Sequence, residues 1–127
     1  MQDKHLYEYA VVRVVPHVER EEFINVGVVL YCGRRKFLQV CFHLDEAKVH
    51  ALCAKTDVDN IKHYLASFEK ICNAAKDGGP IAQLPPAERF RWLTATRSTV
   101  VQCSKVHPGY CTDPEQKLQQ LFTQLVL

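Results

Sequence analysis

Three segments in the first 44 residues carry the apolar pattern of β-strands. Residues 6–15, 25–32 and 36–44 are rich in β-branched and aromatic side chains, and polar or glycine-containing segments separate them. Both faces of the first segment are largely apolar, so we expect this strand to lie in the middle of a sheet. Gly33-Arg34-Arg35 predicts a hairpin turn between the second and third segments. The pattern therefore predicts an antiparallel meander.

Gly27 in the second predicted strand and the charged residues Glu8 and Arg13 in the first do not fit a simple apolar pattern. Gly27 interrupts the second strand, which indicates a β-bulge or the close approach of another group. Arg13 lies among buried neighbours in the first strand, where a charge is costly unless it is paired. Glu19 and Glu22, in the charged segment that follows, are the expected partners of Arg13 in a structural ion pair.

After residue 44 the apolar period changes from two to between three and four, which predicts helices. Asp45 is expected to cap a short helix that extends to about Ala54, and Asp57 a longer one that extends to about Lys76. A glycine of Gly78-Gly79 is expected to end the longer helix. The stripe of apolar side chains on that helix is predicted to comprise Val58, Ile61, Leu65, Phe68, Ile71, Cys72 and Ala75.

The last third of the chain combines helical and strand patterns. A short helix is predicted over residues 86–92, a strand over 98–103, a turn at His107-Pro108-Gly109, and a final helix from Asp113 onwards. The order of elements predicts an α+β fold with an antiparallel sheet, a β-meander plus a later strand, and helices packed on one face. The length of 127 residues fits a single domain over 1–127.

The composition of the chain argues against two classes of binding partner, nucleic acids and membranes. Lysine and arginine number 16 against 14 aspartate and glutamate, a formal net charge of +2, and the one basic run is Arg34-Arg35-Lys36. This balance argues against a nucleic-acid partner. The N-terminus shows no secretory signal, and no apolar run approaches the roughly 20 residues of a membrane helix. We therefore expect a cytoplasmic protein with no membrane partner.

The six cysteines show no C-x-x-C spacing, and in a reducing compartment we expect them to be small core residues. Tyr7, Tyr9 and Trp92 are likewise expected in the core. Cys103, His107 and Cys111 recur every four residues. This spacing raises the alternative that these three side chains are ligands of a zinc ion. Pro108-Gly109 would break a helix that aligned these three residues, so the sequence predicts no metal and no cofactor.

Candidate chemistry is concentrated near the two ends of the chain, and P-loop, dinucleotide-binding, zinc-protease and hydrolase motifs are absent from the sequence. The Arg97 guanidinium fits a carboxylate or a phosphate, and two hydroxyls follow it. A histidine can transfer protons near neutral pH. No catalytic residue can be assigned. The candidate polar pocket for an anion comprises Arg13, Glu19, Glu22, Arg97, Ser98, Thr99 and His107.

Two blocks resemble the bacterial family of the domain of unknown function 3037. They are Tyr7–Pro16, continuing through Glu19–Tyr31, and Arg89–Gln102, continuing to Val106–Gly109 and Asp113-Pro114. Members of this family are often encoded beside a HipA-like kinase, so the resemblance implies an accessory role with that kinase as partner. The resemblance implies no reaction.

These observations leave two leading hypotheses. The first is a non-catalytic module that binds a protein partner, which predicts an exposed apolar patch. The alternative is an enzyme or ligand-binding protein for a phosphorylated or carboxylated substrate, with Arg13, Arg97 and His107 in one pocket. The alternative requires the first and last strands to be neighbours. Whether the protein is an enzyme and whether it forms a homo-oligomer stay open.

Overall fold

The computed structural model describes residues 3–127, and its first half is the predicted meander. Short 3₁₀ turns at Val18–Arg20 and Gly33–Arg35 join the first three strands. A third 3₁₀ turn, Ile81–Gln83, precedes α3. The strands are β1 His5–Val14, β2 Ile24–Cys32, β3 Phe37–Phe42, β4 Val101–Cys103 and β5 His107–Cys111; the helices are α1 Glu46–Leu52, α2 Val58–Cys72, α3 Pro86–Thr94 and α4 Pro114–Leu125. The α+β class and the antiparallel sheet are confirmed.

Strand β1 lies at the centre of the sheet, as its two apolar faces predicted. The order is β3-β2-β1-β4, and β5 also pairs with β1, beside the half of β1 that β4 does not reach. Ser104 connects these two edge strands: its hydroxyl accepts a hydrogen bond from the Val11 N–H at 2.8 Å. The first and last strands of the chain are therefore neighbours.

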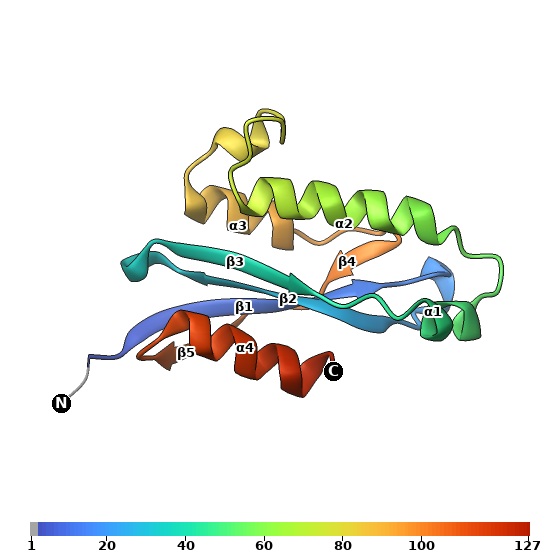
Figure 1. Ribbon diagram of the computed structural model, residues 1–127, viewed down its shortest axis with the longest axis horizontal. Helices are drawn as coiled ribbons and strands as arrows, with labels where there is room; N and C mark the ends of the chain where they lie inside the picture. Colours follow the sequence, from blue (N-terminus) through green and yellow to red (C-terminus); the bar gives the residue numbers. More distant parts are fainter. Residues whose placement is uncertain (1–2) are drawn as a thin grey trace.

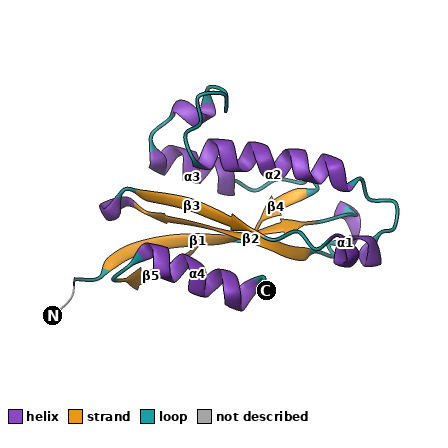
Figure 2. Ribbon diagram, in the orientation of Figure 1, coloured by secondary structure: helices purple, strands orange, loops and turns teal. Residues whose placement is uncertain are grey.

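Helices cover both faces of the sheet, so the prediction that they pack on one face is wrong. Helices α2 and α3 lie on one side and α4 on the other (Figures 1 and 2). The reason is that the central strands bury side chains in both directions. Val12 and Val29 pack in the core beneath α2 and α3, whereas Val28 and Leu30 pack with Leu118 of α4.

Two segments of the last third differ from their predicted structure. The predicted turn at His107-Pro108-Gly109 is the start of β5, because Pro108 lies on an edge strand, where the missing N–H is tolerated. The strand predicted over 98–103 is confined to Val101–Cys103. No helix within residues 3–127 is long and apolar enough to cross a membrane.

Helix starts follow the predicted capping residues, but the end of α2 does not. The side chains of Asp45, Asp57 and Asp113 each accept a backbone N–H at the start of a helix. Helix α2 ends at Cys72 rather than near Lys76, and Ala74, not a glycine, adopts the left-handed conformation. The final carbonyls of α2 are hydrogen-bonded by a side chain from α3, which the local sequence of α2 could not reveal.

Gly27 lies where β2 meets β3, and its position is consistent with the predicted close approach. A Cβ atom added there would lie 2.5 Å from the Phe42 ring and 2.6 Å from the Cys41 carbonyl oxygen. The β1–β2 register also shifts beside it, since Val12 pairs with Gly27 but Arg13 pairs with Asn25. Val26 is thus the extra residue of a β-bulge.

Candidate functional site

Arg13 and Arg97 line one cavity of about 400 Å³ at the β4 edge of the sheet, which we name the Arg13 cavity. The hydroxyl-bearing residues Thr96 and Ser98 come from the segment between α3 and β4, and Glu21 comes from the β1–β2 connection. Arg97 comes from the same segment as Thr96 and Ser98, whereas Arg13 lies on β1 and Gln102 on β4. The complete lining is Arg13, Val15, Val18, Glu21, Phe23, Thr96, Arg97, Ser98 and Gln102.

Arg13 has no carboxylate partner within residues 3–127, so the predicted pair with Glu19 or Glu22 does not form. Its guanidinium carbon lies 4.0 Å from the centre of the Phe23 ring. Its Nε is buried and without a hydrogen bond. Aromatic stacking orients the guanidinium but leaves its donors free for a ligand.

Arg97 is held by the end of α3. Its guanidinium donates to the carbonyl oxygens of Trp92 and Leu93, and it lies 4.3 Å from the centre of the Trp92 ring. These contacts place a positive charge at the C-terminus of the helix, where the dipole favours it. Arg97 is therefore a positioned cation that also lines the cavity.

The other predicted pocket residues lie elsewhere. Glu22 pairs with Arg20, and Glu19 lies 3.6 Å from His17, with both carboxylates exposed. The Thr99 hydroxyl donates to the Val101 carbonyl oxygen. The exposed His107 lies on β5 with its ring centre 5.3 Å from that of Tyr9. The structure thus brings together Arg13, Arg97 and Ser98 but not the acid–base groups that the alternative hypothesis requires.

A second depression, the α2–α3 groove, lies between α2, α3 and β4 and has a volume of about 280 Å³. Buried Phe68, Ile71 and Leu93 form its floor, and Tyr64 and Trp92 stand beside it with 48% and 41% of their surfaces exposed. The remaining lining residues are Ser67, Arg97, Thr99 and Val101. Arg97 belongs to both depressions, so the groove and the Arg13 cavity share this residue.

The prediction that Trp92 is a core residue is wrong, whereas Tyr7 is buried as predicted. Helix α3 buries Arg89, Phe90 and Leu93, and Trp92 falls outside that set. Tyr64 was not singled out from the sequence. Tyr64 lies three positions after Ile61 and four before Phe68, within the apolar arc of α2, so the helical pattern gave no signal that it is exposed.

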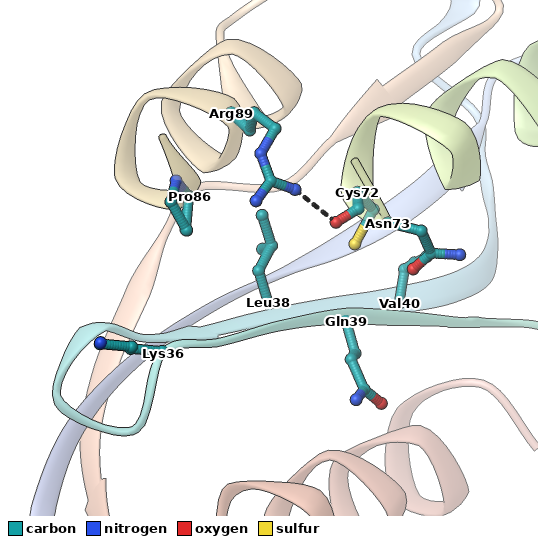
Figure 3. Close-up of a pocket in the computed structure, with 8 residues that line it drawn as sticks. All are labelled: Lys36, Leu38, Gln39, Val40, Cys72, Asn73, Pro86 and Arg89. Atoms are coloured by element: carbon teal, nitrogen blue, oxygen red, sulfur yellow. Dashed lines mark hydrogen bonds between the residues drawn. The ribbon is translucent and has the colours of Figure 1, made fainter. Parts of the chain in front are cut away.

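A third depression, which we name the Arg89 cavity, has a volume of about 440 Å³ and lies between β3, the end of α2 and the start of α3 (Figure 3). Arg89 is only 7% exposed. Its guanidinium donates to the carbonyl oxygens of Leu84, Ile71 and Cys72. The complete lining is Lys36, Leu38, Gln39, Val40, Cys72, Asn73, Pro86 and Arg89.

Cysteine side chains serve mainly as apolar packing. Cys32, Cys72 and Cys111 are buried, and all six cysteines are free thiols. Burial raises the pKa of the Cys72 thiol to about 12, and that of Cys103 also to about 12, so both are neutral at physiological pH. Within residues 3–127, no three metal-ligating side chains gather, and Cys103, His107 and Cys111 form no such group.

The three depressions differ in the groups that line them. The groove offers aromatic surface beside a fixed cation, and the two cavities offer guanidinium donors. Searches of the curated proteins and of the solved structures returned no match. The model of the family described as "Protein of unknown function (DUF3037)" matches residues 9–126, which is nearly the whole chain. The chain therefore belongs to the DUF3037 family.

Proposed function

We propose that the protein is a non-catalytic module that binds a protein partner through the α2–α3 groove, and that the partner is a HipA-like kinase. The observation that carries this proposal is the exposure of Tyr64 and Trp92 in the lining of a groove whose other apolar residues, Phe68, Ile71 and Leu93, are buried. Tyrosine, tryptophan and arginine dominate the binding energy of protein interfaces, and this groove has all three. The choice of kinase rests on the family association alone.

The electrostatics of the groove favour a particular segment of the partner. Arg97 stacks on Trp92 at one end of the groove, and no carboxylate within residues 3–127 pairs with it. An apolar side chain of the partner would cover Phe68 and Ile71, while an adjacent aspartate or glutamate would approach Arg97. The partner segment is thus expected to combine an apolar anchor with a carboxylate.

The test is a binding measurement with a purified HipA-like kinase, the partner proposed above. Replacing Tyr64→Ala or Trp92→Ala removes an aromatic contact worth about 2 kcal/mol at an interface centre, so each change should weaken binding roughly thirtyfold. Titration calorimetry gives the dissociation constants. Tyr110→Ala is the matched control, because Tyr110 is a 68% exposed tyrosine on β5, outside the groove.

Two results would contradict the proposal. One is the absence of binding between the purified proteins. The other is an equal loss of affinity for Tyr64→Ala and Tyr110→Ala, which would place the contact elsewhere. Thermal unfolding of each variant establishes that the fold is retained, which is expected for Tyr64 because about half of its surface already faces solvent.

A second candidate function is the binding of a small carboxylate or phosphate ligand in the Arg13 cavity. It is supported by the unpaired Arg13, whose buried Nε has no partner while Thr96 and Ser98 line the same wall. The Glu21 carboxylate in this wall opposes an anion, and His107 lies outside it, so binding without catalysis is the expected activity. This second candidate function thus keeps the anionic ligand of the alternative hypothesis but not its catalysis.

Thermal unfolding with a panel of small carboxylates and nucleotides, at constant ionic strength, tests this candidate. A ligand present at about 100 times its dissociation constant should stabilise the protein by about 2.7 kcal/mol. Arg13→Gln should abolish that stabilisation, whereas Arg20→Gln, on the neighbouring exposed segment, should leave it unchanged. A flat response across the panel contradicts the candidate.

A further inference from the structure

The Arg89 cavity is an open depression lined by three elements far apart in sequence, and it carries positive charge. Its lining includes Leu38 and Val40 of β3, Cys72 and Asn73 at the end of α2, and Pro86 at the start of α3 (Figure 3). None of its lining residues carries a carboxylate, whereas two of them, Lys36 and Arg89, carry a positive charge. This combination favours an anionic occupant.

Arg89 is oriented by the protein but not neutralised by it. Its Nε donates to Leu84 at 2.8 Å, and its Nη1 donates to Ile71 at 3.1 Å and to Cys72 at 2.6 Å. Its other terminal nitrogen, Nη2, has no hydrogen-bond acceptor within residues 3–127 and points into the cavity beside Leu38 (Figure 3). A guanidinium that is more than nine-tenths buried thus keeps free donors on the cavity side.

The protein supplies no negative charge to this guanidinium. No carboxylate lies within salt-bridge distance of Arg89 in the part of the chain that the structure describes. The adjacent Cys72 thiol stays neutral, because burial raises its pKa to about 12. A buried charge that lacks a counterion is costly, so an anion in the cavity would relieve that cost.

The start of α3 adds further donors next to Arg89. Pro86 has no N–H, the preceding Pro85 provides no capping side chain, and the first helical hydrogen bond runs from the Arg89 N–H to the Pro85 carbonyl. The N–H groups of Ala87 and Glu88 are therefore free of helical partners. The Glu88 carboxylate is in this first turn, but it is exposed and does not line the cavity.

We propose that the Arg89 cavity binds the phosphate group of a small molecule. The guanidinium Nη2 would bind the phosphate oxygens, and Lys36 at the rim would contribute attraction at longer range. The amides of Ala87 and Glu88 follow the lining residue Pro86 and would report the bound anion. Lys36 follows the turn between β2 and β3 and is exposed, and its ammonium extends along this turn, away from Arg89 (Figure 3). The volume of about 440 Å³ is in the range of small-molecule sites.

The experiment follows the backbone amide resonances of Ala87 and Glu88 by NMR during titration of the full chain. Inorganic phosphate and adenosine monophosphate are the two probes, with ionic strength held constant by chloride. The expected result is a saturable shift of both resonances. Tighter binding of the nucleotide would identify a phosphate ester as the ligand, and equal or tighter binding of the free ion would identify phosphate itself.

Lys36→Asn removes the rim charge and retains a residue that tolerates the left-handed conformation of this position, where φ is 52°. It should weaken binding roughly fivefold, as expected for one partly solvated charge. Arg34→Asn makes the same change in the same turn outside the cavity and should have no effect. Arg13→Gln should also have no effect, which separates this site from the Arg13 cavity.

The proposal is overturned if neither probe gives a saturable shift of the Ala87 and Glu88 resonances at millimolar concentration. It is also overturned if Lys36→Asn and Arg34→Asn weaken binding equally, because that result indicates general surface charge. Neither result depends on a protein partner, so the proposed binding of a kinase through the α2–α3 groove is tested separately.

Discussion

Arg89→Met is expected to lower the free energy of unfolding by about 3 kcal/mol. Arg89 donates to three carbonyl oxygens, two of which, those of Ile71 and Cys72, belong to the final turn of α2. Methionine fills the space of the arginine stem but donates no hydrogen bond. The Ile71 carbonyl would keep the Ala74 N–H at 3.3 Å, but those of Cys72 and Leu84 would lose their donor. Each such group costs about 1–3 kcal/mol, partly offset by removal of a buried charge.

Urea denaturation measures this change, and Arg91→Met is the matched control. Arg91 lies two positions further along the same helix and is exposed, so its replacement should change the unfolding free energy by less than about 0.5 kcal/mol. If Arg89→Met is within the same narrow range, then Arg89 does not hold the end of α2, and the account of this helix end is wrong.

Gly27→Ala is expected to cost about 2 kcal/mol, although alanine is ordinarily the better strand residue. The added Cβ would lie 2.6 Å from the Cys41 carbonyl oxygen, which is backbone of the paired strand β3 and cannot move alone. The Phe42 ring, at 2.5 Å, would also have to shift. Relief of both contacts requires displacement of β3, which is the usual cost of overpacking a core.

Gly33→Ala is the control for this prediction. The closest atom to an added Cβ there is the Tyr31 hydroxyl oxygen at 2.7 Å, which is the far end of a side chain rather than backbone of a paired strand. Thermal unfolding should therefore show a much larger loss of stability for Gly27→Ala than for Gly33→Ala. Equal effects would mean that the contact between β2 and β3 at Gly27 is less close than the structure has it.

The sequence predicted those features that depend on local pattern. The meander, the central position of the first strand, and the caps at Asp45, Asp57 and Asp113 follow from residue types and their spacing, and the structure confirms them. The α+β class follows from the order of these elements. The resemblance to the domain of unknown function 3037 is confirmed by the family match over residues 9–126.

The features that the sequence did not reveal depend on contacts between distant segments. Helix α2 ends early because its carbonyls are hydrogen-bonded by Arg89, 17 positions beyond Cys72. The edge strand β5 forms because it pairs with β1, about a hundred residues earlier, despite its turn-like proline and glycine. Helix α4 packs opposite α2 because β2 buries both faces, and local periodicity carries no information about that choice.

In the candidate site, too, the sequence could not reveal the features that depend on contacts between distant segments. The pairing of β1 with β4 brings Arg13, on β1, and Arg97, in the segment before β4, to one cavity. Glu19 and Glu22 instead contact His17 and Arg20 within their own segment. His107 is separated because it lies on β5, beside Tyr9, rather than on β4. The exposed aromatic residues of the α2–α3 groove could be recognised only after both helices were placed on the sheet.

Hydrogen exchange of the chain with and without the HipA-like kinase tests the central claim most directly, because the exchange of each segment reports its own protection. The account predicts slower exchange on binding in α2, in α3 and in the segment of residues 95–101 that follows α3, with little change in β3 and β5. Protection confined to β3, β5 or α4, or no protection in any segment, would contradict the proposal that this protein binds its partner through the α2–α3 groove.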